Sequence, residues 1–228
     1  MIVLAIAAAA ALAARVPEQV LKSSLDRISN AKNIRVRAVV MSDEVVATGQ
    51  KLQRSSDGVI KVRRPNGFRV DTVADRYRRT IQYDGKTLAV YDPDRKFYAT
   101  YNAPATIDAT VADVKEKLGL DLPLSQLFAQ NAYDQMKVQR AATYVGLHRV
   151  QGVACHHLAF AQDNVDWQIW IGESDQLPRK IVIDFKTRPG RPQYVAILSD
   201  WNLDAPMTAS EFTFVPPAGS EKIDWVAQ

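Results

Sequence analysis

The chain has 228 residues, a formal net charge of +4 and a hydrophobic fraction of 47%, which is enough to fill the core of one ordinary to large domain. A mildly basic charge does not by itself identify a partner. The single cysteine, Cys155, excludes an intramolecular disulfide, and we interpret it as a buried, unreactive thiol.

The first residues are typical of an export signal. Residues 2–12 form an uncharged apolar run, and Ala11-Leu12-Ala13 fits the small-x-small rule for cleavage. We therefore expect a signal peptide over residues 1–13, a single domain over residues 14–228, and an exported, soluble periplasmic protein. Because no basic segment precedes the run, a longer leader stays open, and an Ala-rich helix of the mature domain is the alternative. The run is too short to span a bilayer.

An amphipathic helix is predicted over residues 17–31, with Pro17 in its first turn. A period-two alternation of apolar residues then predicts seven strands, at residues 34–40, 45–54, 59–64, 68–74, 77–83, 87–91 and 97–101. Turn residues separate several of them, at Asp57-Gly58, Pro65-Asn66-Gly67, Asp84-Gly85 and Asp92-Pro93-Asp94. Since no helix lies between these strands, the sheet should be antiparallel.

A helical insertion interrupts the strands. Thr106 or Asp108 is expected to cap a helix over residues 109–118 that ends at Gly119, and Pro123 begins a second short helix over residues 123–128. The segment from Leu118 to Phe128 is rich in leucine. Only the sheet is available to cover so much apolar surface.

Strands resume at residues 142–150, 154–161 and 193–203, around a hairpin over residues 165–185 in which Pro178 leads the second strand. A short strand over residues 212–219, stopped by two prolines, ends the chain. A twisted sheet of this many strands tends to curl. We predict a mainly β (α+β) fold, a strongly curved antiparallel half-barrel of about eleven strands with short helices on its concave side.

Several segments resemble the LolA-like superfamily of outer-membrane lipoprotein carriers. They are residues 83–93 (YDGKTLAVYDP), Trp170-Ile171 with residues 177–180 (LPRK), and residues 212–219 (FTFVPPAG). With residues 155–160 and 165–170, the chain is most similar to an uncharacterised family of predicted periplasmic proteins in that superfamily. The resemblance implies a curved sheet whose hydrophobic concavity, covered by helices, accepts acyl chains or another apolar ligand. Its relatives include carriers, lipid-binding lipoproteins and an envelope-stress sensor.

Residues 51–80 contain nine Lys and Arg against three Asp, a net charge of +6. Arginine forks match the geometry of phosphate and carboxylate groups, so this segment is interpreted as a docking face for an anionic lipid, a lipoprotein or an acidic protein. A solvated sheet face is the alternative. The candidates for an anionic head group or a partner are Arg54, Arg69, Arg78 and Arg79.

The run Cys155-His156-His157 contains candidate metal ligands. In a strand Cys155 and His157 share a face while His156 points away, and His148 can add a ligand only if its strand pairs in register. Since a zinc site needs three or four ligands, no metal and no cofactor is predicted. No G-x-S-x-G motif occurs and the carboxylates are spread singly, so we expect no enzyme.

The sequence thus predicts a non-catalytic periplasmic binding or carrier protein for an acylated or otherwise hydrophobic ligand, such as a lipid, an acyl chain or a lipoprotein. The alternative is an envelope sensor or regulatory protein–protein interaction module that uses the basic face. Nucleic acid is not an expected partner, and membrane contact would be peripheral at most. The residues expected to line the cavity and its lid are Phe68, Tyr83, Leu88, Val90, Phe97, Leu118, Leu122, Leu124, Leu127, Phe128, Trp167 and Ile169.

Overall fold

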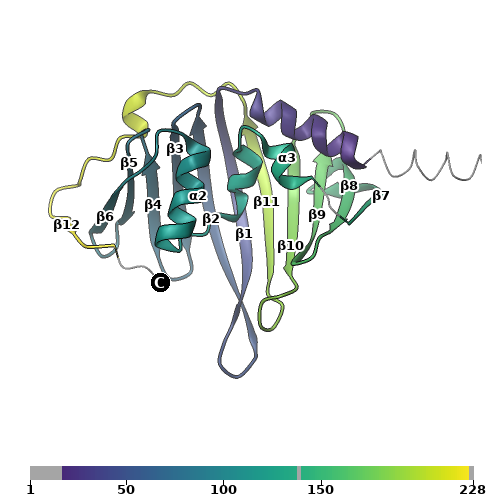
Figure 1. Ribbon diagram of the computed structural model, residues 1–228, viewed down its shortest axis with the longest axis horizontal. Coiled ribbons are helices and arrows are strands. Elements are labelled where there is room, and N and C mark those ends of the chain that lie inside the picture. The colour runs from purple at the N-terminus through teal and green to yellow at the C-terminus, as the bar shows by residue number, and fades with distance from the viewer. Residues whose placement is uncertain (1–16, 138–139, 226–228) are drawn as a thin grey trace, which may run out of the picture. The chain divides into compact units, whose positions relative to one another are not determined.

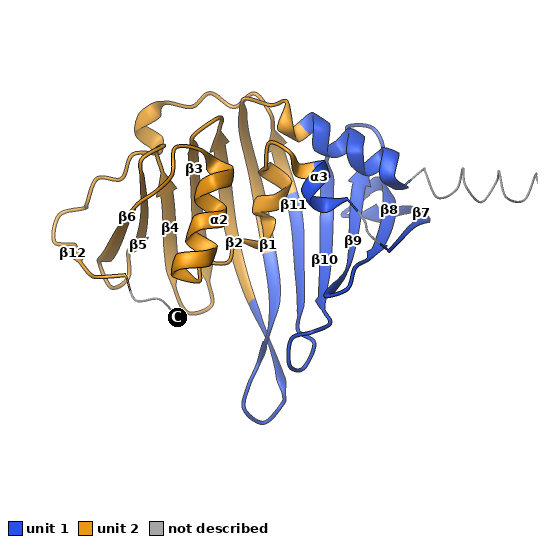
Figure 2. Cartoon of the chain, in the orientation of Figure 1, with its two compact units in different colours: residues 1–27, 40–54, 133–198 blue, residues 28–39, 55–132, 199–228 orange. Residues whose placement is uncertain are grey.

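The computed structural model describes residues 17–137 and 140–225, so the predicted signal peptide lies outside the described residues. The chain divides into two compact units (Figure 2). Unit 1 comprises residues 1–27, 40–54 and 133–198, and unit 2 comprises residues 28–39, 55–132 and 199–228. Each unit is described by itself below.

The fold is mainly β, as predicted, with few short helices (Figure 1). The strands have the order β12-β6-β5-β4-β3-β2-β1-β11-β10-β9-β8-β7. Their bounds are β1 (Asn33–Val45), β2 (Lys51–Arg63), β3 (Gly67–Ala74), β4 (Arg78–Tyr83), β5 (Thr87–Asp92), β6 (Phe97–Asn102), β7 (Ala141–Val150), β8 (Val153–Ala161), β9 (Val165–Gly172), β10 (Pro178–Phe185), β11 (Gln193–Asn202) and β12 (Glu221–Lys222).

The helical segments are a helix over residues 17–29, α2 (Ile107–Leu118), the 3₁₀ helix η1 (Pro123–Phe128), α3 (Ala132–Met136) and the 3₁₀ helix η2 (Ala209–Glu211). The predicted cap Thr106 and the predicted end at Gly119 are confirmed, and α2 begins at Ile107, before the predicted start at residue 109. Thr106 accepts a hydrogen bond from the amide of Ala109, and Gly119 ends the helix at φ 66°. Glycine suits this left-handed position because it carries no Cβ. The helix α3 was not predicted.

The predicted turn at Asp57-Gly58 is wrong, because both residues lie inside the 13-residue strand β2. The chain turns earlier, over residues 46–50, where Gly49 adopts φ 82°. In the strand Asp57 pairs with Val73 and Gly58 with Thr72 of β3, and the carboxylate of Asp57 forms an ion pair with Arg37. Residues 51–54 of one predicted strand and residues 59–63 of the next therefore belong to the single strand β2, whereas residues 46–50 form the turn. The other predicted turns and the hairpin β9–β10 are confirmed.

The strand register of unit 2 shows which side chains share each face of its sheet. Phe68 pairs with Tyr83, and Tyr83 with Leu88, so these buried side chains share one face. Tyr101 pairs with Leu88 on the same face and donates a hydrogen bond from its hydroxyl to Asp113 of α2, at 2.5 Å. We call this the α2 face.

The opposite face of the same strands is covered by the C-terminal strap, which we define as residues 203–225. Phe212 of the strap is fully buried, and the guanidinium of Arg63 lies 5.0 Å from the centre of its ring. Phe214 packs against Tyr91 and Tyr98, with ring centroids 5.9 and 5.2 Å apart. We call this the strap face.

The predicted strand over residues 212–219 is wrong. Residues 209–211 form η2, the following residues are irregular, and only Glu221 and Lys222 pair with β6. This pairing is parallel, which differs from the purely antiparallel sheet that the sequence predicts. The aromatic residues of the strap cross the sheet and pack on it with their rings, so they do not extend it.

Unit 1 contains the meander β7–β10, again with two faces. Leu158, Trp167, Ile169 and Ile181 are buried on what we call the Trp167 face. Cross-strand neighbours place Cys155, His157, Gln168, Trp170 and Lys180 on the other side, the Trp170 face. Trp167 stacks on Phe160 with ring centroids 4.2 Å apart.

Candidate functional site

The twelve residues predicted to line a cavity do not all fall in one unit. Ten of them belong to unit 2, whereas Trp167 and Ile169 are buried in the meander of unit 1. The α2 face brings together Phe68, Tyr83 and Leu88, all buried, and Val90 shares that face at intermediate exposure. The predicted residues thus include members of an apolar face in each unit, and their role as a cavity lining stays a prediction.

Tyr83 places a polar group among the buried apolar side chains of the α2 face. Its ring lies 5.2 Å from that of Phe68, and its hydroxyl donates a hydrogen bond to the carbonyl of Pro104. Thr110 of α2 donates a second hydrogen bond to the same carbonyl, at 3.0 Å. Burial raises the pKa of Tyr83 above its ordinary value, so the hydroxyl stays neutral. These bonds join the start of α2 to the sheet.

The lid segment, residues 118–128, changes along its length from partly exposed to buried. Leu118, Leu120 and Leu122 have intermediate exposure. Leu124, Leu127 and Phe128 in η1 are buried, at 8%, 1% and 4% exposure, and their surroundings include Trp201, whose ring lies 6.2 Å from that of Phe128.

The backbone of the lid segment has few polar attachments. The residue before η1, Leu122, provides no side-chain cap for it. Past the segment, the amide of Gln130 donates a hydrogen bond to Asp108 of α2, at 3.0 Å. A six-residue 3₁₀ helix gains little from its own hydrogen bonds, so η1 is held chiefly by the burial of its apolar side chains.

Phe97 occupies a different environment from the other predicted cavity residues. It begins β6, pairs with Asp92 and Glu221, and keeps 37% of its surface exposed. It lies at a strand end, beside the hairpin turn over residues 93–96, and is more exposed than Tyr83 or Leu88, which are fully buried.

The four arginines proposed for an anionic group all have partners within the protein. Arg54, in unit 1, forms an ion pair with Glu44 at 2.6 Å. In unit 2, Arg69 forms two hydrogen bonds with Asp71, and Arg78 pairs with Asp94. The guanidinium of Arg79 lies 4.7 Å from the ring centre of Tyr77.

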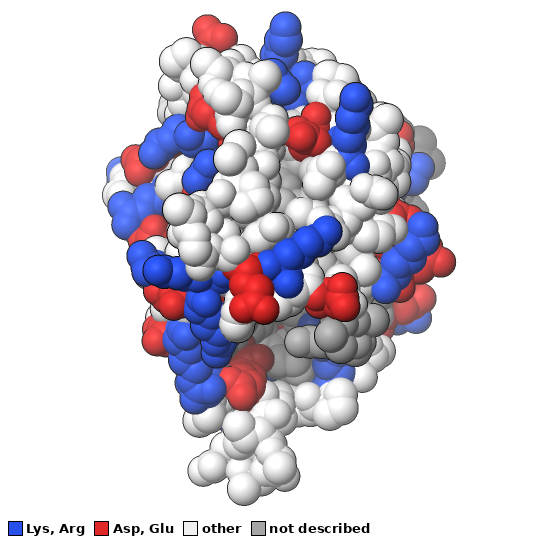
Figure 3. Space-filling view, turned by 90° about the vertical axis from the view of Figure 1, so that its left-hand side faces the viewer, with Lys and Arg blue, Asp and Glu red and all other residues white. Residues whose placement is uncertain are grey.

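The positive charge of residues 51–80 is therefore offset in part by carboxylates, several of which lie outside that segment. On the side of the protein drawn in Figure 3, Lys and Arg side chains lie next to Asp and Glu side chains over most of the charged area. Glu44, Asp94 and Glu211 come from elsewhere in the chain. A charge sum over consecutive residues cannot show this pairing.

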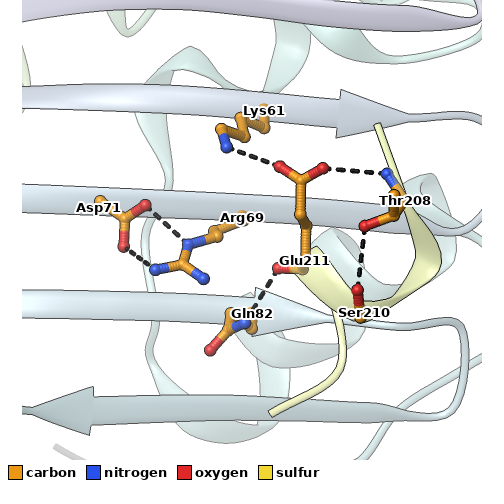
Figure 4. Close-up of polar contacts among 7 residues, drawn as sticks. All are labelled: Lys61, Arg69, Asp71, Gln82, Thr208, Ser210 and Glu211. Carbon is orange, nitrogen blue, oxygen red and sulfur yellow. Dashed lines mark hydrogen bonds and ion pairs between the residues drawn. The ribbon is translucent and has the colours of Figure 1, made fainter. Parts of the chain in front are cut away.

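A polar cluster on the strap face includes one of these carboxylates (Figure 4). Glu211 of the strap accepts a hydrogen bond from Lys61 at 2.7 Å and another from the amide of Thr208 at 2.9 Å. Its backbone carbonyl accepts from the side-chain amide of Gln82 at 3.0 Å. The bond from Lys61, followed by that from Thr208, lowers the pKa of Glu211 below its ordinary value. The cluster therefore fastens the strap to β2 and β4.

Sequence reasoning did not single out Ser24, on the helix over residues 17–29. Ser24 is fully buried, and its hydroxyl has no hydrogen-bond partner. Leu21 and Leu25 beside it are each 1% exposed, so the hydroxyl lies on the apolar face of the helix. The helical spacing of these residues is visible in the sequence and could have drawn attention to it.

Cys155, one of the candidate metal ligands, is fully buried, and burial raises the pKa of its thiol. Among residues 17–137 and 140–225, no group of three or more His, Cys, Asp or Glu side chains is arranged to hold a metal ion.

None of the described helices combines the length and the apolar character needed to cross a membrane.

Comparison with known proteins finds a family but no detailed function. No curated protein matches the chain. Among solved structures, LprF from Mycobacterium bovis is 13% identical over 85% of this chain and 95% of its own, with a TM-score of 0.49. A LolA superfamily protein from Nitrosomonas europaea is 11% identical over 85% and 97% of the two chains, with a TM-score of 0.35.

The MucA/MucB complex of Pseudomonas aeruginosa contains a chain that is 13% identical over 87% of this protein and 61% of that chain, with a TM-score of 0.47. The model of one protein family, described as "Predicted periplasmic protein (DUF2092)", matches residues 17–226. The match covers almost all of the described chain, as the resemblance in its hairpins predicts. The protein belongs to this family of predicted periplasmic proteins.

Proposed function

We propose that the protein binds or carries an acylated or otherwise hydrophobic ligand in the periplasm, without catalysis. The observation that carries the proposal is the lid segment, whose backbone lacks a side-chain cap and whose attachment is mainly apolar. An attachment of this kind can be exchanged for contacts with an apolar ligand, because apolar burial is non-directional. The periplasmic description of the family supports the location.

The decrease in side-chain exposure along the lid segment supports the same proposal. Leu118, Leu120 and Leu122 are partly exposed, and they lead along the chain to the buried Leu124 and Leu127. An acyl chain that contacts these leucines meets apolar groups throughout. Each methylene that it buries contributes about 0.8 kcal/mol, so a long chain can be held without a specific polar contact.

The proposal is tested first with the protein purified from the periplasm in native form. We expect lipid mass spectrometry to find co-purified acylated molecules, and a fluorescent fatty acyl probe to bind the delipidated protein. If no lipid co-purifies and the probe does not bind, the proposal is wrong.

The role of the lid segment is tested with Leu127→Ala and with Val114→Ala as a matched control. Both residues are buried in unit 2, at 1% and 0% exposure, but Val114 lies in the middle of α2. We expect Leu127→Ala to raise the dissociation rate of the probe about tenfold, and Val114→Ala to leave it close to that of the wild type. Equal rates in the two variants would show that the lid segment does not retain the ligand.

A protein partner at the β3–β4 hairpin is the second candidate function. Tyr77 and Arg79 lie exposed at its tip, where Arg79 contacts an aromatic ring, whereas the neighbouring Arg78 pairs with Asp94. If this surface binds an acidic envelope protein, Arg79→Glu should abolish capture of that protein while probe binding stays intact. Arg78→Glu is the comparison, because Arg78 already has a carboxylate partner.

A further inference from the structure

The pairing of β7 with β8 brings two histidines into contact on the Trp170 face of unit 1. Gly146 pairs with His157 and His148 pairs with Cys155, so His148 and His157 are diagonal neighbours on one face. Their Nδ1 atoms lie 3.0 Å apart. The register that the sequence could not supply is therefore present, and the two rings point nitrogen toward nitrogen.

Gln168 of β9 orients the ring of His157. The Oε1 atom of Gln168 lies 2.9 Å from Nε2 of His157, and an amide oxygen only accepts hydrogen bonds. Nε2 therefore carries the proton, and Nδ1 of His157 accepts the hydrogen bond that Nδ1 of His148 donates. A metal-binding histidine is usually fixed in this way, by a bond from its other nitrogen to an oxygen. The ring is further held by stacking on Trp170, with centroids 3.9 Å apart.

A metal ion can take the place of the proton that the two Nδ1 atoms share. Two nitrogens that each lie about 2.05 Å from a metal are about 2.9–3.3 Å apart, so the rings, now 3.0 Å apart, need to move little to bind one ion. Among divalent ions, a site of imidazole nitrogens binds Cu²⁺ more tightly than Zn²⁺.

The charged groups around the pair limit its affinity. Lys180 of β10 lies over the other side of the stack, with its Nζ 4.7 Å from the ring centre of Trp170. Arg149 follows His148 in β7, so its side chain projects from the opposite face, and it donates to the carbonyl of Gly152. Two imidazoles beside the ammonium of Lys180 form a weaker site than a complete set of protein ligands, with the remaining positions taken by water.

We infer that His148 and His157 form a two-histidine site for a divalent transition-metal ion, with Cu²⁺ preferred over Zn²⁺. The remaining histidine gives an internal control. His156 precedes His157 in β8 but points to the opposite face, where its Nδ1 lies 2.9 Å from the hydroxyl of Tyr144. The site is independent of the proposed ligand binding, because it uses neither the lid segment nor the α2 face.

The experiment is a titration of tag-free protein with Cu²⁺ alone, in a buffer that does not bind the metal. Because His157 stacks on Trp170, bound Cu²⁺ should quench the fluorescence of that tryptophan, and electron paramagnetic resonance should show nitrogen ligands. We expect His148→Gln and His157→Gln each to weaken the apparent affinity at least about tenfold, and His156→Gln to leave it unchanged. Zn²⁺ should compete weakly.

His148 is exposed, so His148→Gln tests the inference even if the His157 variant folds poorly. Trp170→Phe should remove most of the quenching while the resonance signal persists, which separates the reporter from the ligands. The inference is overturned if His148→Gln binds Cu²⁺ as the wild type does, or if His156→Gln weakens binding as much as the other two variants.

Discussion

The ring of Phe212 lies against Gly67, so closely that a Cβ at position 67 would be 3.2 Å from Cγ of the ring. The same Cβ would be 3.3 Å from the carbonyl oxygen of Arg63. Glycine at the start of β3 thus allows the strap to pack on the sheet. We expect Gly67→Ala to lower the free energy of unfolding by about 1–3 kcal/mol, as overpacking does, measured by urea denaturation.

A smaller residue at position 212 provides the control for this prediction. Phe212→Leu alone should destabilise the protein, because Phe212 is fully buried. In the Gly67→Ala background the same change should cost less, since it removes the close contact. Additive effects of the two substitutions would show that they do not interact through this contact.

The carbonyl of Pro104 accepts hydrogen bonds from both Tyr83 and Thr110. We expect Tyr83→Phe and Thr110→Val each to cost about 0.5–1.5 kcal/mol of stability, because either one leaves the carbonyl a partner. The double variant should lose more stability than the two single variants together, since it leaves the buried carbonyl oxygen without a hydrogen-bond partner. Urea denaturation of the four proteins measures the difference, and strict additivity would contradict the prediction.

The bond between Lys61 and Glu211 predicts a pH dependence of stability. The pKa of Glu211 is lowered from its ordinary 4.5 in the folded protein, so the folded state favours the carboxylate. Its contribution is present above pH 4.5 and is lost as the pH falls through the folded pKa. In the Glu211→Gln variant the free energy of unfolding should therefore fall less than in the wild type as the pH is lowered below 4.5.

The control for this pH dependence is the effect of Lys61→Met. This substitution removes the largest cause of the lowered pKa of Glu211. The free energy of unfolding should therefore depend less steeply on pH below 4.5 in this variant too. Both side chains are more than a quarter exposed, so the coupling between them should be about 0.2–1 kcal/mol and should weaken in high salt. If the free energy of unfolding depends on pH below 4.5 in both variants as it does in the wild type, the bond between Lys61 and Glu211 is not the cause of this pH dependence.

The unpartnered hydroxyl of Ser24 predicts a stabilising substitution. A buried hydroxyl without a hydrogen bond costs about 1–3 kcal/mol, so Ser24→Ala should raise the free energy of unfolding of the ligand-free protein. Ser23→Ala is the matched control, since Ser23 is exposed on the same helix and gains the same helix propensity. A gain no larger in Ser24→Ala than in Ser23→Ala would contradict the prediction.

Local patterns in the sequence determined the fold class and most of the elements. The period-two alternation located the strands, Thr106 and Gly119 located the ends of α2, and Pro178 located the start of β10. These succeed because strand alternation and helix caps depend on neighbours within a few residues. The same patterns, with the resemblance they carry, also led to the family.

Only the tertiary structure decided which groups meet across the sheet. Asp57-Gly58 has the composition of a turn, but Asp57 pairs with Arg37 and stays in a strand. The segment from Phe212 onward alternates like a strand, yet its rings pack on a sheet face. In each case a contact distant in sequence outweighs the local preference.

The sequence by itself determined a mainly β chain of the predicted periplasmic family, with apolar faces on its strands and a leucine-rich lid segment. The tertiary structure decided that Arg54 and Arg78 are paired with carboxylates from outside the basic segment, that the strap covers one face of unit 2, and that His148 contacts His157. The physical reason is strand register, which sets the cross-strand neighbours of each side chain and is not encoded in any single strand.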